Sequence, residues 1–331
     1  MNPSVSSLVA ASRVVSIPLR TKFRGITERE LLVFEGTNGW SEWAAFPEYS
    51  DQEAATWLAA AIEWGFAPLP KLKRQSVKVN AILPAVNNQE ISKILSRAGK
   101  FSTVKIKVAE AGQDLSEDLA RILEVQALYP EAKIRLDANG GFDIPTAMEL
   151  LEKLRFEGIE LEYFEQPVAS IAQLAEIRLE ISKRGFSTPV AADESVRKSS
   201  DPLAVELASA ADILVLKSAP LGGIANALEI AASSKLAVVS SSAMQSSIGL
   251  GAELHFAACL DSAEYDAGLG TMNLFAGDLV KDSLKPVDGV LEVRRPEVSS
   301  SALDTLKAED HRYDWWIARL ERCGRLLGLE S

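Results

Sequence analysis

The sequence predicts an α/β protein in which a closed barrel of the TIM type carries a small α+β capping domain. Three observations lead to this prediction. The chain has 331 residues, 47% of them hydrophobic and 24% charged, enough to bury a large core in one domain with a smaller one attached. From residue 78 onward, strand-like apolar runs alternate with helix-like stretches. Before residue 78 and after about residue 285 this alternation is missing.

The alternating part of the chain has the pattern of βα units, with apolar runs at roughly 25-residue spacing. The runs span residues 78–83, 103–108, 133–139, 161–167, 189–195, 213–219, 237–242 and, more briefly, 266–270. Amphipathic stretches between them predict helices at residues 116–128, 147–154, 172–183 and 224–233. Eight such runs fit a closed barrel better than an open sheet. An open dinucleotide-binding sheet is the alternative, but no GxGxxG sequence follows any run.

The segments outside the barrel pattern predict the capping domain. Residues 29–35 and 40–44 flank the turn signal Asn38-Gly39 and predict a hairpin, and residues 53–64 predict a helix. Near the other end, residues 287–293 are apolar around Asp288-Gly289, and residues 313–327 predict a last helix. We therefore expect a capping domain at residues 1–77, completed by residues 285–331, and a barrel at residues 78–284.

Composition excludes several classes of protein. Lys and Arg number 35 against 46 Asp and Glu, a formal net charge of −11, which argues against binding nucleic acid or an anionic membrane. No apolar run has the length of a membrane span, and the N-terminus makes a poor signal peptide. Cys259, Cys323 and two histidines give no zinc-site spacing and no disulfide framework. We expect a cytoplasmic enzyme with a small-molecule substrate, as a monomer or small homo-oligomer.

Charged side chains occur where buried barrel strands should be apolar. Five of the expected strands carry them near their C-terminal ends. In chain order they are Lys105 and Lys107; Arg135, Asp137 and the polar Asn139; Glu165; Asp193; and Lys217. The C-terminal ends of barrel strands meet at one mouth, where barrel enzymes have their active sites. These side chains are therefore candidates for one site.

The types of side chain indicate a metal site flanked by lysines. Asp137, Glu165 and Asp193 follow one another at intervals of 28 residues, and oxygen ligands from separate strands suit Mg²⁺ better than zinc. A lysine close to a cation and a second lysine should have a lowered pKa, which makes it a usable base. Taken one at a time, each residue has an ordinary structural explanation, such as a surface lysine or a helix cap. Taken together, five coincidences at matching strand ends favour a site.

The same motifs resemble those of the enolase superfamily, in its muconate-lactonizing branch. The motifs are Lys105-x-Lys107, Asp137-Ala-Asn139, Glu165-Gln-Pro167, Asp193-Glu194-Ser195 and Lys217-x-x-Pro220-x-Gly222-Gly223, with residues 24–27 and 39–42 similar to its capping segment. Residues 240–251 and 268–271 resemble its seventh and eighth barrel loops. The resemblance implies a (β/α)7β barrel with an α+β cap. It also implies a hydro-lyase reaction of menaquinone biosynthesis, the dehydration of 2-succinyl-6-hydroxy-2,4-cyclohexadiene-1-carboxylate to 2-succinylbenzoate through an enediolate.

The resemblance also implies roles for individual residues. Asp137, Glu165 and Asp193 would bind Mg²⁺, for which Mn²⁺ is a possible substitute. Lys107 would be the catalytic base and then the acid, and Lys217 would face it across the substrate. Further residues are expected to bind substrate or to tune the base. They are Lys105, beside Lys107; Arg135, toward the succinyl carboxylate; and Ser241 and Gly268, in the last two barrel loops.

Other functions stay open or are disfavoured. N-acylamino acid racemisation, with N-succinylamino acids as substrates, needs the same metal and two lysines and therefore remains an alternative. Dipeptide epimerisation is disfavoured because Asp266-Ala267-Gly268 is not the Asp-x-Asp of such enzymes. A lysine aldolase would not need three carboxylates, and a non-catalytic barrel would be expected to have lost a ligand. The charges of Arg20, Lys22 and Arg24 either clamp a dicarboxylate or form a solvated surface.

Overall fold

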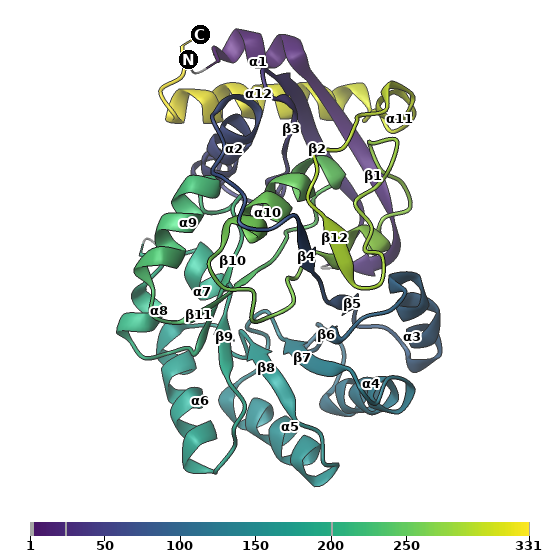
Figure 1. Ribbon diagram of the computed structural model, residues 1–331, viewed down its shortest axis with the longest axis vertical. Helices are drawn as coiled ribbons and strands as arrows, with labels where there is room; N and C mark the ends of the chain where they lie inside the picture. The colour runs from purple at the N-terminus through teal and green to yellow at the C-terminus, as the bar shows by residue number, and fades with distance from the viewer. Residues whose placement is uncertain (1–2, 24, 200, 331) are drawn as a thin grey trace.

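The computed structural model describes residues 3–23, 25–199 and 201–330. Figure 1 shows two parts, a curled sheet ringed by helices and, above it, a smaller sheet with helices of its own. Both ends of the chain lie in the upper part. None of the helices in the described ranges combines the length and the apolar composition that crossing a membrane requires.

The upper, capping part is built on an antiparallel sheet in the order β1-β2-β3. Its strands are β1 (Ser12–Phe23), β2 (Ile26–Gly36) and β3 (Gly39–Trp43), and its helices are α1 (Val5–Ala11), α2 (Asp51–Phe66), α11 (Ser300–Thr305) and α12 (Asp310–Leu326). The hairpin predicted at Asn38-Gly39 is confirmed, since Gly36 pairs with Gly39. The two helices predicted for this part correspond to α2 and α12. The sequence analysis missed β1, and Arg24 lies outside the described residues.

The lower part is a parallel sheet of seven strands, in the order β11-β10-β9-β8-β7-β6-β5. The strands are β5 (Ala81–Leu83), β6 (Thr103–Lys107), β7 (Lys133–Asp137), β8 (Leu161–Glu165), β9 (Val190–Ala192), β10 (Ile213–Leu216) and β11 (Ala237–Ser240). The helices are α3 (Asn88–Leu95), α4 (Leu115–Leu128), α5 (Ile144–Phe156), α6 (Ile171–Lys183), α7 (Glu194–Arg197), α8 (Ala204–Leu207), α9 (Ile224–Ser233) and α10 (Ser247–Cys259), with 3₁₀ turns η1 (Ser96–Ala98) and η2 (Gly270–Leu274). The alternation of strands and helices confirms the predicted barrel class.

Two of the expected strands differ from the prediction. The run at residues 78–83 is divided, because β4 (Ser76–Lys78) pairs antiparallel with β12 (Val290–Glu292) and only β5 joins the barrel sheet. The run at residues 266–270 forms no strand. It closes the barrel through two isolated parallel bridges, Val79 with Ala267 and Ser241 with Gly268. The predicted domain boundary after residue 77 falls inside β4, and the division into 1–77 with 285–331 and 78–284 stays a prediction.

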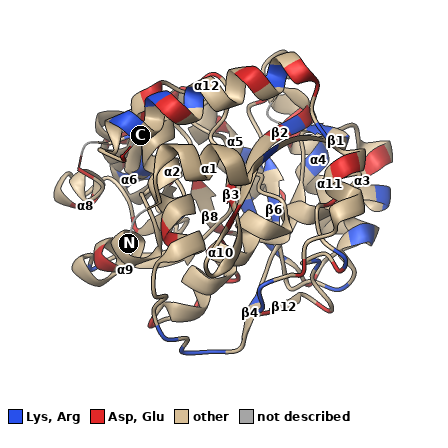
Figure 2. Cartoon of the chain, turned by 90° about the horizontal axis from the view of Figure 1, so that it is seen from above, with Lys and Arg blue, Asp and Glu red and all other residues tan. Residues whose placement is uncertain are grey.

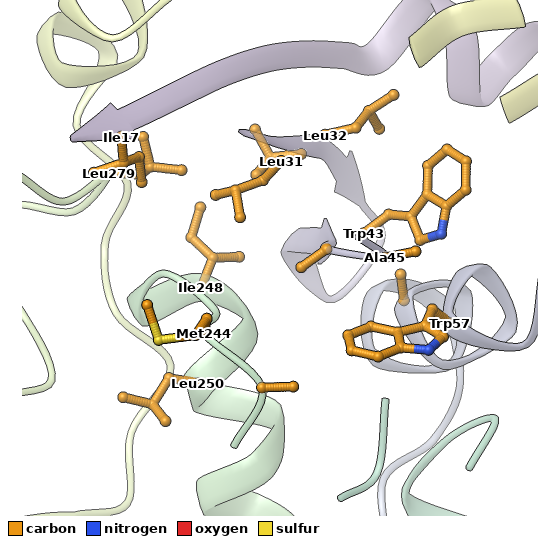
Figure 3. Packing of buried hydrophobic residues seen from close by; sticks show 14 of the residues in the cluster. Ile17, Leu31, Leu32, Trp43, Ala45, Trp57, Met244, Ile248, Leu250 and Leu279 are labelled. Carbon is orange, nitrogen blue, oxygen red and sulfur yellow. The ribbon is translucent and has the colours of Figure 1, made fainter. Parts of the chain in front are cut away.

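The capping part and the barrel share a hydrophobic core. One cluster of buried side chains joins the cap sheet, α2 and α12 to α10 of the barrel. Figure 3 shows Ile17, Leu31 and Leu32 of the cap above Ile248 and Leu250 of α10. A second cluster lies between the barrel strands and their outer helices. Because burial of this apolar area holds the two parts together, loops at the barrel mouth meet the cap directly.

Charges on the outside are mixed in sign. Seen from above in Figure 2, acidic and basic residues follow one another along α12. Such a surface does not form the continuous basic face that binding to a polyanion needs.

Candidate active site

The candidate residues lie at the C-terminal ends of adjacent barrel strands. Lys105 and Lys107 are on β6, Asp137 ends β7 and Glu165 ends β8. The strand register places Lys107 opposite Asp137, and Asp137 opposite Glu165. Strand alternation then turns these side chains to the same face, the barrel interior.

Two further candidates follow the next strands directly. Asp193 comes after β9, and Lys217 comes after β10. The side chains of both are buried, as are those of the residues on β6, β7 and β8. The structure therefore brings together the six residues that the sequence analysis singled out as metal ligands and lysines.

Ion pairs connect the buried lysines to the buried carboxylates. Nζ of Lys105 lies 3.1 Å from Oδ2 of Asp137 and 3.0 Å from Oε1 of Glu165. Nζ of Lys107 lies 3.1 Å from the same Asp137 oxygen. Nζ of Lys217 lies 2.5 Å from Oδ2 of Asp193. Each charge thus has an opposite charge beside it, without which its burial would cost several kcal/mol.

The two lysines of β6 differ in their affinity for a proton. Burial and the neighbouring Lys105 ammonium lower the pKa of Lys107, although Asp137 acts in the other direction. Burial also acts to lower the pKa of Lys105, but Asp137 and Glu165 outweigh it and raise that pKa well above its ordinary value. Lys107 is therefore the lysine that gives up its proton more readily, as a base must.

The carboxylates respond to the same cluster. The lysines outweigh burial and hold the pKa of Asp137 far below its ordinary value. For Asp193, Lys217 and Arg197 outweigh burial and lower the pKa to about 2. Burial and the negative charge of Asp137 raise the pKa of Glu165 to about 7. Neighbouring carboxylates with such different proton affinities are typical of functional sites.

The three carboxylates fit a hard divalent cation in their chemistry. All their donor atoms are carboxylate oxygens, the ligands that Mg²⁺ prefers. Oδ1 of Asp193 is buried and accepts no hydrogen bond within the described residues, and Nε of Arg197 lies 3.4 Å from it. In the described part of the chain, no three His, Cys, Asp or Glu side chains already form a metal-binding group. The carboxylates are instead paired with the lysines.

A cavity of about 40 Å³ opens on this cluster. It is lined by Phe23, Ile82, Lys105, Lys107, Asp137, Asn139, Asp193, Lys217, Ser241, Ser242, Ala243, Met244, Gly268 and Thr271. The predicted substrate-binding residues Lys105, Ser241 and Gly268 are among them. Larger hollows of about 600 Å³ lie elsewhere, one between α6 and the start of β10 and the other between α9 and the start of β11. They lack a comparable cluster of buried charges, so the small cavity is the candidate site.

Arg135 is placed differently from the expectation. Its guanidinium donates to Glu162 at 2.5 Å, to Oδ1 of Asn80 at 3.0 Å and to the carbonyl oxygen of Asp266 at 2.6 Å. It does not line the cavity. Arg135 lies two residues before Asp137 on β7, one layer further from the mouth. We therefore assign it no substrate contact.

Two lining residues of the cavity, Phe23 of the cap and Met244 of a barrel loop, were not singled out by the sequence analysis. Phe23, at the end of β1, lines the cavity, and its ring centroid lies 5.9 Å from Nζ of Lys107. Arg20 donates to the carbonyl oxygen of Phe275 at 2.9 Å, while Lys22 is exposed. Met244 also lines the cavity and has a positive φ of 61°. No short-range pattern marks Phe23, because its position depends on how the cap meets the barrel. Arg20 and Lys22, which the sequence analysis named, are not among the residues that line the cavity.

Comparison with known proteins agrees with this arrangement. The family described as enolase C-terminal domain-like matches residues 88–297, and the one described as enolase N-terminal domain-like matches residues 14–65. The chain is 44% identical to the o-succinylbenzoate synthase of Mycobacterium tuberculosis (strain ATCC 25618 / H37Rv) over 98% of this chain and 97% of that protein. The chain belongs to the o-succinylbenzoate synthase family of the enolase superfamily.

Other members of the superfamily support the same fold. The o-succinylbenzoate synthase of Mycolicibacterium smegmatis is 43% identical over 98% of each chain. Muconate lactonizing enzyme from Pseudomonas fluorescens, solved with muconolactone, superposes with a TM-score of 0.75 at 18% identity, over 90% of this chain and 98% of that one. N-succinyl Arg/Lys racemase from Bacillus cereus gives 0.73 at 17% identity, over 90% and 97%. Enzymes of this superfamily generally use a divalent metal.

Proposed function

We propose that the chain is a hydro-lyase that converts 2-succinyl-6-hydroxy-2,4-cyclohexadiene-1-carboxylate to 2-succinylbenzoate, a step of menaquinone biosynthesis. Family membership over nearly the full chain supports the reaction. The observation that carries the mechanism is the buried cluster of lysines and carboxylates at the barrel mouth. We also propose that the protein is cytoplasmic and is a monomer or a small homo-oligomer.

Lys107 acts as the base and then as the acid. In its neutral form it takes the proton on the carbon next to the ring carboxylate, and the electron pair left behind gives an enediolate. Lys107 then returns that proton to the hydroxyl group as the carbon–oxygen bond breaks, so that water leaves and the ring becomes aromatic. One base serves both steps when both bonds lie on the same face of the ring. Burial and Lys105, which lower the pKa of Lys107, favour the neutral form.

Asp137, Glu165 and Asp193 would hold a Mg²⁺ ion, or Mn²⁺ in its place. When bound, this ion supplies positive charge where the two oxygens of the enediolate become negative. Lys105, which lies 3.0 Å from each oxygen of Glu165, keeps that carboxylate in place.

The remaining lining residues orient the substrate. Lys217 enters the cavity from the end of β10, and its ammonium group stabilises negative charge over the ring face. Ser241 and Gly268, joined by an isolated bridge, form the cavity wall where the barrel closes after β11. A Cβ atom at Gly268 would lie 2.5 Å from Oγ of Ser241, so any larger residue at this position would clash with Ser241.

An ultraviolet assay for aromatisation tests the reaction, with and without a chelator. The parent protein should form 2-succinylbenzoate, and chelation should stop it until Mg²⁺ is restored. Lys107→Ala should reduce turnover at least a thousandfold while the circular dichroism spectrum stays unchanged. Lys133→Ala is the matched control, because Lys133 is exposed on the neighbouring strand β7 and pairs with Glu162. Full turnover in Lys107→Ala would reject the one-base mechanism.

Racemisation of N-succinylamino acids is the second candidate, because two lysines line the same cavity from β6 and from the end of β10. Racemisation needs a base on each face of the substrate, whereas dehydration needs only Lys107. Lys217→Ala should therefore abolish racemisation but only slow dehydration. Equal loss of both activities would assign Lys217 a direct role in both.

A further inference from the structure

One buried carboxylate near the site has no part in the mechanism described so far. Glu253 lies on α10, is fully buried and forms no ion pair with a lysine or arginine within the described residues. It accepts three hydrogen bonds, all from uncharged donors. Burial raises the pKa of Glu253, which means that burying the charged carboxylate costs free energy. Leucine or alanine would fill a helix position of this kind without that cost.

Two of the donors are the peptide groups that directly follow Lys217. The backbone N–H of Ser218 donates to Oε2 of Glu253 at 2.7 Å, and that of Ala219 donates to Oε1 at 3.0 Å. Hydrogen bonds from peptide groups to a carboxylate are stronger than those to a neutral acceptor. They fix the backbone at the point from which the Lys217 side chain enters the cavity.

The third donor connects Glu253 to the next barrel loop. Nε2 of Gln245 donates to Oε1 of Glu253 at 3.0 Å, and Oε1 of Gln245 accepts from the backbone N–H of Ala243 at 2.6 Å. Ala243 lines the same cavity as Lys217. One carboxylate thus joins two adjacent loops that form the cavity wall.

We propose that Glu253 is a positioning residue that sets the backbone of Lys217 and, through Gln245, the backbone of Ala243, so that the ammonium group of Lys217 meets the substrate in a fixed place. This inference rests on the proposed dehydration. A network of this kind acts on the geometry of the bound substrate, and displacement of a charged group by about 1 Å reduces turnover on the order of a hundredfold.

Glu253→Gln is the sharpest perturbation, because it keeps the shape of the side chain. All three partners of Glu253 are donors, so the amide group of glutamine must turn one NH₂ toward a donor. We expect kcat for dehydration to fall at least tenfold, with KM within threefold of the parent and an unchanged circular dichroism spectrum. We also expect the amides of Ser218 and Ala219 to exchange with deuterium at least tenfold faster.

Glu63→Gln is the matched control. Glu63, on α2, accepts from the backbone N–H groups of Ile224 and Ala225, at the far end of the same loop. Glu63→Gln perturbs the same kind of hydrogen bond, but at Ile224 and Ala225, which lie further along the chain from Lys217 than Ser218 and Ala219 do. Its kcat should stay within twofold of the parent.

A second change should restore the network. In the double variant Glu253→Gln/Gln245→Glu, the new carboxylate accepts from the amide of residue 253 and still accepts from Ala243. We expect at least a threefold recovery of kcat over Glu253→Gln. If Glu253→Gln does not fold, Gln245→Met decides instead, since it removes one of the three hydrogen bonds of Glu253 and the one that Gln245 accepts from Ala243; at least a threefold loss of kcat is expected.

The outcomes separate this proposal from the proposed function. If the parent aromatises the substrate and Glu253→Gln (or Gln245→Met in its place) matches it in kcat, Glu253 has no positioning role. If the parent does not aromatise the substrate, the proposed function fails, and amide exchange at Ser218 and Ala219 still tests the contact with Glu253. Unchanged exchange there would overturn the proposal independently of any turnover.

Discussion

Glu42 gives a stability prediction whose size follows from the structure. This residue of β3 is buried where the cap meets the barrel, and it accepts hydrogen bonds from the backbone of Ser246 and of Gly249 at 3.1 and 3.2 Å and from Oγ of Ser246. Burial outweighs these bonds and the nearby charge of Arg29, and raises the pKa of Glu42 from 4.5 to about 7. Between these two values the folded protein binds more protons than the unfolded chain. The free energy of unfolding therefore falls as the pH rises through this range.

At 1.36 kcal/mol per pKa unit, a folded-state pKa of about 7 against 4.5 corresponds to roughly 3 kcal/mol in total. Between pH 5 and pH 8, about 2.5 kcal/mol of this should be lost. Glu42→Gln does not titrate, and every other group is shared with the parent. The free energy of unfolding of the parent minus that of Glu42→Gln should therefore decrease by about 2.5 kcal/mol from pH 5 to pH 8.

Urea unfolding followed by tryptophan fluorescence at pH 5, 6, 7 and 8 measures this difference. Glu35→Gln is the control, because Glu35 is exposed on the neighbouring strand β2. The pH dependence found for Glu42→Gln should exceed that found for Glu35→Gln. A difference between the parent and Glu42→Gln that stays constant to within about 0.5 kcal/mol would refute the reasoning, since it would mean that the carboxyl group titrates alike in both states.

Three further predictions concern packing and the cavity. Leu320→Ala, in the buried face of α12, should lower the free energy of unfolding in urea by about 2–5 kcal/mol, and a loss below about 1 kcal/mol would contradict the packing. Gly270→Ala, whose Cβ would lie 2.6 Å from the carbonyl oxygen of Asn80, should cost about 1–3 kcal/mol, whereas Gly277→Ala, with its nearest contact at 3.4 Å, should cost less than half as much. Phe23→Ala should admit water to Lys107 and weaken the effect of burial that lowers its pKa, so the rising limb of kcat/KM should move to higher pH. A limb at an unchanged pH would show that Phe23 does not shield the base.

The sequence was sufficient to place the lysines and carboxylates because their signal is local. A charged residue in a buried apolar strand costs free energy unless it is paired or has a function, so it can be recognised from the strand's own sequence. The period of two then determines its face, and the register of β6, β7 and β8 agrees with it. Lys107, Asp137 and Glu165 are direct register partners across three strands.

The remaining parts depend on contacts that no local pattern records. Arg135 carries the same signal as Asp137, yet it pairs with Glu162 of the next strand and with Asn80, which directly precedes β5. The run at residues 78–83 divides because the backbone N–H of Val79 donates to Gly289, far along the chain. Phe23 reaches the cavity only through the packing of the cap. Each of these outcomes is decided by a partner distant in sequence.

The balance of charge at the barrel mouth fits the proposed substrate. The cluster holds three ammonium groups and three carboxylates, namely Lys105, Lys107, Lys217, Asp137, Glu165 and Asp193, and is formally neutral when all are ionised. The base step needs Lys107 in its neutral form, which leaves the cluster with one net negative charge, and a bound divalent cation would bring the total to one net positive charge. Burying that charge without compensation is costly, so the site favours an anionic ligand. The substrate of the dehydration and the N-succinylamino acids of the racemisation are both carboxylates and meet this requirement.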